Sequence, residues 1–162
     1  MKNIALLLLP FLGFTMTLMS DANAESALAT CKKSISQKYE IEIHESISDG
    51  AMTYKEHEDI KFGNLDEQHS FVQYKEHVLE VEKIPFKDLQ HRTVSLKSES
   101  VAIDRSDLYL RQNKSYKTYC ILVPFSGIGS SGSFQRFAAL IAIRGGHADG
   151  EVKITGEVIK RQ

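Results

Sequence analysis

Hydrophobic positions follow two different periods along this chain. Over residues 26–38 the apolar side chains recur at steps of three and four residues, which predicts a short helix with Cys31 on its inner face. From residue 39 to residue 47 the pattern changes to alternation, with Ile41 and Ile43 between charged neighbours, which predicts a strand with one face in water. A short N-terminal helix is therefore expected to lead into β-structure.

The middle of the chain continues the strand pattern. Asp49 and Gly50 form a turn signal, so residues 52–62 are expected to be the return strand of a hairpin. Further short strands are expected at residues 93–103 and 108–111, separated by a polar tetrapeptide.

Residues 65–84 admit two interpretations. As a helix, the segment has Asn64 and Glu67 as a capping box and Pro85 just beyond its end. As a strand, it has the Phe, Val and Tyr content that strands favour, although the alternation breaks at Val78. We favour a strand with a bulge because the neighbouring segments are rich in β-formers; the alternative is an α+β fold with a second helix here.

The C-terminal third contains three β-rich segments joined by linkers that supply the glycines turns require. The middle segment is apolar on both faces, so it is expected in the centre of a three-stranded antiparallel meander; a buried helix there is the alternative that periodicity leaves open. These segments are residues 116–125, 133–144 and 151–160. The expected fold class is thus mainly β, an antiparallel sandwich or barrel-like sheet with a short N-terminal helix.

The first 24 residues differ in character from the rest. An almost unbroken apolar run over residues 4–19 is followed by Ala22-Asn23-Ala24, with small residues where a signal peptidase requires them. This layout predicts a secretory signal peptide over residues 1–24. Residues 25–162 are then a single β-rich exported domain, located in a periplasm or secreted, with no stable membrane insertion after cleavage.

Composition and charge narrow the possible partners. The chain has 162 residues, 42% of them hydrophobic, and a formal net charge of −1. Nucleic-acid binding and polybasic membrane docking draw their affinity from a surplus of Lys and Arg, and this chain has no such surplus. A nucleic-acid partner is therefore not expected.

The two cysteines predict one covalent bond. Cys31 and Cys120 both follow the signal peptide, and thiols that reach an exported compartment are oxidised. A Cys31–Cys120 disulfide is expected. The alternative, a lipobox ending at Cys31, is disfavoured because Asp21 and Glu25 separate that cysteine from the apolar run.

Histidines suggest one candidate site. Five of the six histidines lie between residues 44 and 91, among many acidic residues, and imidazole with carboxylate suits zinc or copper. No two of them have the tight spacing of a known ligand motif, so a solvated polar face is the preferred interpretation and no cofactor is expected. The candidate metal ligands are His44, His57, His69 and His77.

A second candidate is a loop that matches Gly-x-Gly-x-x-Gly after an apolar strand. The same pattern occurs in dinucleotide-binding turns, but a Rossmann unit needs more strand–helix–strand repeats than the remaining chain can supply. A hairpin loop that forms a binding surface is the interpretation we retain. The candidate binding residues are Gly127, Gly129, Ser130, Ser131 and Gly132.

Function is constrained less than fold. The sequence lacks a Gly-x-Ser-x-Gly elbow, and bonded cysteines cannot act as thiolate nucleophiles, so the balance is against an enzyme. The first hypothesis is a small exported binding protein that contacts another envelope or secreted protein, for example as an inhibitor or immunity factor. The alternatives are a metal- or ligand-binding envelope protein that uses the histidines, and an envelope hydrolase with dispersed catalytic residues.

Overall fold

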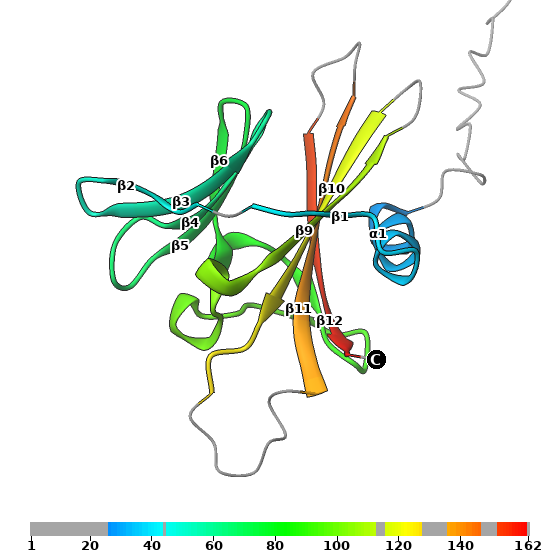
Figure 1. The fold of residues 1–162 in the computed structure, drawn as a ribbon. Helices are drawn as coiled ribbons and strands as arrows, with labels where there is room; N and C mark the ends of the chain where they lie inside the picture. The colour runs from blue at the N-terminus through cyan, green and yellow to red at the C-terminus, as the bar shows by residue number, and fades with distance from the viewer. Residues whose placement is uncertain (1–25, 44, 113–115, 128–135, 147–151, 162) are drawn as a thin grey trace, which may run out of the picture.

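The computed structural model describes residues 26–43, 45–112, 116–127, 136–146 and 152–161. Within them the chain forms two β-sheets and one α-helix, so the expected mainly β fold with a short N-terminal helix is confirmed. The smaller sheet, the larger sheet and the helix lie side by side as three layers, from left to right in Figure 1. The two sheets remain separate and do not close into a barrel.

Helix α1 (Ala27–Ser36) lies within the predicted range. The hydroxyl of its N-cap residue, Ser26, accepts a hydrogen bond from the backbone N–H of Ala29 at 3.1 Å, which satisfies one of the free donors at a helix start. The helix buries Ala27 and Cys31, as the sequence periodicity indicates.

The smaller sheet is an antiparallel meander of consecutive strands. Its strands are β2 (Ile47–Asp49), β3 (Met52–His57), β4 (Ile60–Asn64), β5 (Ser70–Tyr74) and β6 (His77–Glu80). The hairpin expected at Asp49 and Gly50 is present, since Asp49 pairs with Met52. The single return strand expected over residues 52–62 is wrong, because Glu58 adopts a φ of +48° and the chain turns there into β4.

The ambiguous segment 65–84 forms strands and not a helix. It contains β5, β6 and the 3₁₀ turn η1 (Val81–Lys83). The strand interpretation is correct in type, but the expected bulge is a hairpin turn, with Lys75 at a φ of +53°. Tyr74 and His77 pair across that turn.

The larger sheet contains the predicted C-terminal meander. Its order is β1 (Glu40–Ile41), β9 (Asp107–Gln112), β10 (Tyr116–Pro124), β11 (Phe137–Gly146), β12 (Val152–Lys160), β7 (Phe86–Lys87) and β8 (Thr93–Val94). The apolar strand β11 is its central member, as expected. The sheet is mixed, which corrects the expectation of a purely antiparallel one, because β7 pairs with β12 in parallel.

Two expected strands are shorter than the sequence pattern indicates. Residues 39–47 do not form one strand: β1 pairs with β9 in the larger sheet, and β2 pairs with β3 in the smaller one. Between β1 and β2 the chain passes from the larger sheet to the smaller one. The alternation of apolar and charged residues over 39–47 therefore does not reflect one continuous paired strand. Residues 93–103 contain only the two-residue strand β8. The 3₁₀ turns η2 (Ser98–Ser100) and η3 (Ile103–Arg105) occupy half of the chain between β8 and β9.

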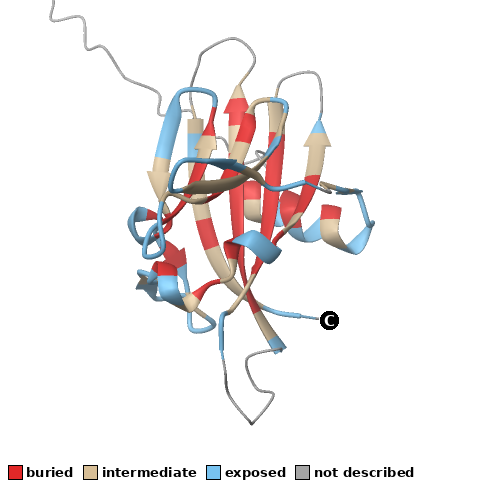
Figure 2. Ribbon diagram, turned by 60° about the vertical axis from the view of Figure 1, so that its left-hand side comes forward, coloured by how far each residue is buried: buried red, intermediate tan, exposed pale blue. Residues whose placement is uncertain are grey.

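The core lies on both faces of the larger sheet. On one face, Ile141 and Ile143 of β11 belong to a buried cluster with Phe62 and Val72 of the smaller sheet. On the other face, Leu140 belongs to a second buried cluster with residues of α1. Figure 2 shows the buried positions concentrated along the central strands. Burial on both faces explains why the sequence of β11 is apolar without alternation.

A disulfide joins the helix to the larger sheet. The Cα atoms of Cys31 in α1 and Cys120 in β10 lie 5.4 Å apart, and both side chains are fully buried. The predicted disulfide is therefore present, and the lipobox alternative does not fit because the sulfur of Cys31 is already bonded. Disulfides of this kind are typical of proteins in oxidising compartments.

The helical part of the described chain offers no membrane span of sufficient length and apolar content. The signal peptide over residues 1–24 lies outside the described residues and stays a prediction, as does the single exported domain over residues 25–162.

A polar contact joins the two sheets at one end of the sandwich. The ammonium of Lys117 in β10 lies 2.6 Å from the carboxylate of Glu58, at the β3–β4 turn, and the buried Tyr119 donates its hydroxyl to the same carboxylate at 3.2 Å. The hydrogen bond from Lys117 is the main cause that lowers the pKa of Glu58, and burial raises the pKa of Tyr119. The carboxylate therefore remains an acceptor and the phenol a donor.

We expect the disulfide to be a major source of stability. Its two cysteines are separated by 89 positions, and closing a loop of that length in the unfolded chain contributes about 4 to 5 kcal/mol on the chain-entropy account. The double variant Cys31→Ala/Cys120→Ala should lose about that amount in guanidinium unfolding. Wild-type protein unfolded in reductant is the control and should match the variant; a loss below about 1 kcal/mol would contradict the expectation.

Gly156 is the second position where we expect a clear stability effect. A Cβ built on Gly156 would overlap the ring of the fully buried Phe86, at the point where β7 pairs with β12. Gly156→Ala should lower the free energy of unfolding by about 1 to 3 kcal/mol through overpacking. Lys153→Ala, at an exposed position of the same strand, is the control and should change it by less than about 0.5 kcal/mol.

Candidate functional site

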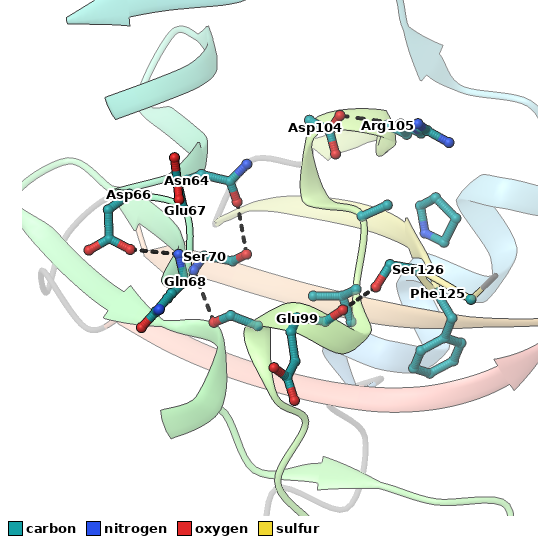
Figure 3. A pocket seen from close by; sticks show the side chains of 15 residues that line it. Asn64, Asp66, Glu67, Gln68, Ser70, Glu99, Asp104, Arg105, Phe125 and Ser126 are labelled. Carbon is teal, nitrogen blue, oxygen red and sulfur yellow. Dashed lines mark hydrogen bonds and ion pairs between the residues drawn. The ribbon is translucent and has the colours of Figure 1, made fainter. Parts of the chain in front are cut away.

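A hollow of about 740 Å³ opens where loops of both sheets meet. It is lined by the β4–β5 loop, by η2 and η3, and by the end of β10 (Figure 3). The labelled lining residues are Asn64, Asp66, Glu67, Gln68, Ser70, Glu99, Asp104, Arg105, Phe125 and Ser126. The hollow has the size of a typical ligand or side-chain pocket.

The β4–β5 loop is held in shape by Asp66. One carboxylate oxygen of Asp66 accepts the backbone N–H groups of Gln68 at 2.8 Å and His69 at 2.9 Å. The backbone N–H of Leu65 donates to the carbonyl of His69 at 2.7 Å and closes the loop. This is an Asx turn, and it fixes one wall of the hollow.

Side-chain hydrogen bonds tie the other walls together. The hydroxyl of Ser98 in η2 accepts the backbone N–H of Ser70 in β5 at 3.0 Å. On the far side, the backbone N–H of Ser126 donates to the carbonyl of Ser100 at 3.0 Å, and the hydroxyl of Ser126 donates to the carbonyl of Glu99. Three segments far apart in the sequence are thereby held as one surface.

The hollow is acidic. Its lining includes the carboxylates of Asp66, Glu67, Glu99 and Asp104 but one guanidinium, that of Arg105. Arg105 lies 4.0 Å from Asp104 and is largely exposed. Because solvent screens its charge, Arg105 offsets little of the negative charge of the four carboxylates. The chemistry available here is acceptance of hydrogen bonds and attraction of cations.

Asp66 also sets the protonation of a neighbouring imidazole. His69 Nδ1 lies 2.8 Å from the Asp66 carboxylate. The hydrogen bond to Asp66 raises the pKa of His69 above 6.5, with smaller contributions from Glu80 and Glu82. The backbone N–H of Gln68 is the main cause that lowers the pKa of Asp66. His69 therefore adds a positive charge beside the hollow. This charge is lost as the pH rises through the raised pKa of His69.

The candidate binding loop touches this hollow at one residue. Gly127 belongs to the lining. Gly129, Ser130, Ser131 and Gly132 lie outside the described residues, so their role as binding residues stays a prediction.

The candidate metal ligands do not converge within the described chain. His57 pairs with Ile60, Ile60 with Tyr74, and Tyr74 with His77, which places the two histidines roughly 14 Å apart across three strand spacings. Two nitrogens on one zinc ion lie at most about 4 Å apart. His69 precedes the opposite end of β5, and His44 lies outside the described residues. Among the residues described, no three His, Cys, Asp or Glu side chains are grouped as a metal site.

Sequence reasoning missed the residues that form the hollow. Asp66 and Glu67 precede β5, whereas Glu99 and Asp104 lie more than thirty positions later in two separate 3₁₀ turns. No local pattern connects them. The one signal in the sequence was the polar segment Asp66-Glu67-Gln68 between two apolar stretches. It indicates a loop, but it does not show which other segments lie next to that loop.

Comparison with known protein families, with curated proteins and with solved structures finds no match for this chain.

The Asp66–His69 pair is directly testable by NMR titration of the histidine ring protons. We expect His69 to titrate above 6.5 and Asp66→Asn to bring its midpoint back toward that value. Because the pKa of His69 is raised by folding, the pair stabilises the fold below 6.5 and this contribution is lost as the pH rises through the raised pKa. Glu67→Gln removes an adjacent carboxylate that makes no contact with His69 and should leave the titration unchanged; an equal shift in both variants would contradict the assignment.

Proposed function

We propose that this protein is a small exported binding protein, periplasmic or secreted, that acts by contact with another envelope or secreted protein. The acidic hollow beside Gly127 is the surface that makes the contact. Its occupant is a basic segment of the partner, with one or more Lys or Arg side chains inserted among the carboxylates. A role as an inhibitor or immunity factor fits a protein of this kind.

The observation that carries the proposal is the charge of a preformed hollow. Four carboxylates against one exposed guanidinium line a space of about 740 Å³. A guanidinium or ammonium entering that space meets carboxylates from more than one side, and charge-assisted hydrogen bonds are the strongest available to such a pair. Complementary charge also speeds the encounter of the two proteins.

Rigid loops support binding as the role of this hollow. The Asx turn at Asp66 and the hydrogen bonds of Ser98 and Ser126 fix the walls without a ligand. A preformed surface loses little conformational entropy on binding, which leaves more of the contact energy as affinity. Loops held on a β-scaffold are a common location of recognition sites.

The proposed location rests on two features. The sequence predicts a signal peptide over residues 1–24, and the Cys31–Cys120 disulfide is of the type found in oxidising compartments. A partner that meets this protein would share that compartment.

The proposal is tested by charge reversal in the hollow. The partner is first captured from an envelope extract on wild-type protein, identified, and purified. We expect Glu99→Lys/Asp104→Lys to weaken its binding by about tenfold or more in calorimetry, because like charges then face the basic segment. Glu56→Lys/Glu76→Lys makes the same charge change at exposed acidic positions of the smaller sheet and serves as the matched control.

Two results would contradict the proposal. One is equal affinity of the two double variants for the captured partner. The other is affinity that does not fall with added salt, since contacts between exposed charges are screened by salt.

A further inference from the structure

A second hollow lies on the opposite side of the larger sheet, beside α1. It has a volume of about 640 Å³ and shares no lining residue with the acidic hollow. Its walls come from the C-terminal half of α1, from β9 and β12, and from the turn between β7 and β8. In Figure 1 this region lies between α1 and the C-terminal end of β12, which is drawn in red.

The floor of this hollow is apolar. Leu122 of β10 and Ile159 of β12 line it, and both belong to the cluster under the helix. Ile35 of α1 adds an apolar wall. Leu89, which is 52% exposed, lies at the edge of the same hollow. Covering such an exposed apolar side chain with a ligand removes apolar surface from water, which favours binding.

Cations border the apolar floor. Lys160 and Arg161, at and just after the end of β12, both line the hollow. The backbone N–H of Arg161 donates to the carbonyl of Arg136 at 2.8 Å. Lys38 lines the same hollow just after α1. Lys32 is neutralised by Glu157 at 2.7 Å. In the described part of the chain, neither Lys38 nor Arg161 has an acidic group within ion-pair distance.

A phenol completes the polar end. Tyr109 of β9 lines the hollow and is 7% exposed. Burial raises the pKa of Tyr109, as do the charges of Glu40 and Asp107, whereas the charge of Arg161 lowers it. The hydroxyl is thus a persistent hydrogen-bond donor within the electrostatic reach of Arg161. Asp107 is the acidic residue of the lining that has no ion pair among the described residues, and the three cations Lys38, Lys160 and Arg161 outnumber it.

We propose that this hollow binds a fatty acid, with the acyl chain on the floor formed by Leu122, Ile159 and Ile35 and the carboxylate held by Arg161 and Lys38. The argument is charge complementarity combined with an apolar floor, because an anionic head and an apolar tail match the two parts of the hollow. A volume of about 640 Å³ is within the range of small-molecule sites. The inference is independent of the proposed function, since the two hollows have separate linings.

The test uses the purified protein with its disulfide formed and sodium laurate as the probe, below its micelle concentration. Calorimetry should show saturable binding of one laurate per chain, no binding of acetate, and weaker binding of the uncharged dodecanol. Lys38→Gln/Arg161→Gln removes both cations that hold the carboxylate and should weaken laurate binding by about tenfold or more, since a hydrogen bond to a charged group contributes about 1.5 kcal/mol or more. Lys97→Gln/Arg105→Gln removes the same two charge types away from this hollow, at Lys97, 3.6 Å from Glu99, and at Arg105 of the acidic hollow, and should leave laurate binding unchanged.

Three outcomes would overturn the inference. They are no saturable laurate binding, equal weakening by the two double variants, and dodecanol binding as tight as laurate. An acidic amphipathic peptide that binds wild-type protein but not Lys38→Gln/Arg161→Gln, while laurate does not bind, would assign the hollow to a protein segment instead. Circular dichroism of both double variants, expected to match wild type, confirms that a loss of binding reflects the hollow and not the fold.

Discussion

Burial of β11 on both faces is the constraint on which the rest of this structure depends. Ile141 and Ile143 face the smaller sheet, and Leu140 faces the helix. A strand of this kind can exist only if both faces are covered, because exposing either would leave a large apolar surface in water. The three layers, and the need for a helix on one side, follow from that requirement.

The helix layer depends on the disulfide as well as on apolar contact. Alpha-helix α1 has ten residues, a length that is marginal for an isolated helix in water. Cys31 fixes it to β10 through Cys120, and Ala27 packs in the cluster beneath it. Because the helix is short, it leaves part of the sheet face uncovered, and the hollow bordered by Lys38 and Arg161 lies there.

The two hollows lie on opposite sides of the larger sheet and differ in charge and polarity. The acidic hollow forms where the loops of the two sheets meet, and its walls are held by hydrogen bonds of Asp66, Ser98 and Ser126. The hollow beside α1 has an apolar floor and basic borders. Neither could be predicted from the sequence, since each collects residues from at least three segments that are adjacent only after the sheets have paired. The predicted loop contributes Gly127 to the first hollow. The described candidate ligands His57, His69 and His77 are spread over the smaller sheet and its β4–β5 loop.

The sequence by itself determined the N-terminal helix, the disulfide partners and the central position of β11, because periodicity, cysteine count and two-sided apolarity can be read from the chain before it folds. Tertiary pairing decided where strands begin and end and in which sheet they lie. The tetrapeptide Tyr-Lys-Glu-His occurs twice and shows the difference. The copy that begins at Tyr54 lies within β3, whereas the copy that begins at Tyr74 forms the turn between β5 and β6, with Lys75 at a φ of +53°. The same four residues adopt two conformations because a backbone hydrogen bond needs a partner strand, and only the assembled sheet supplies one.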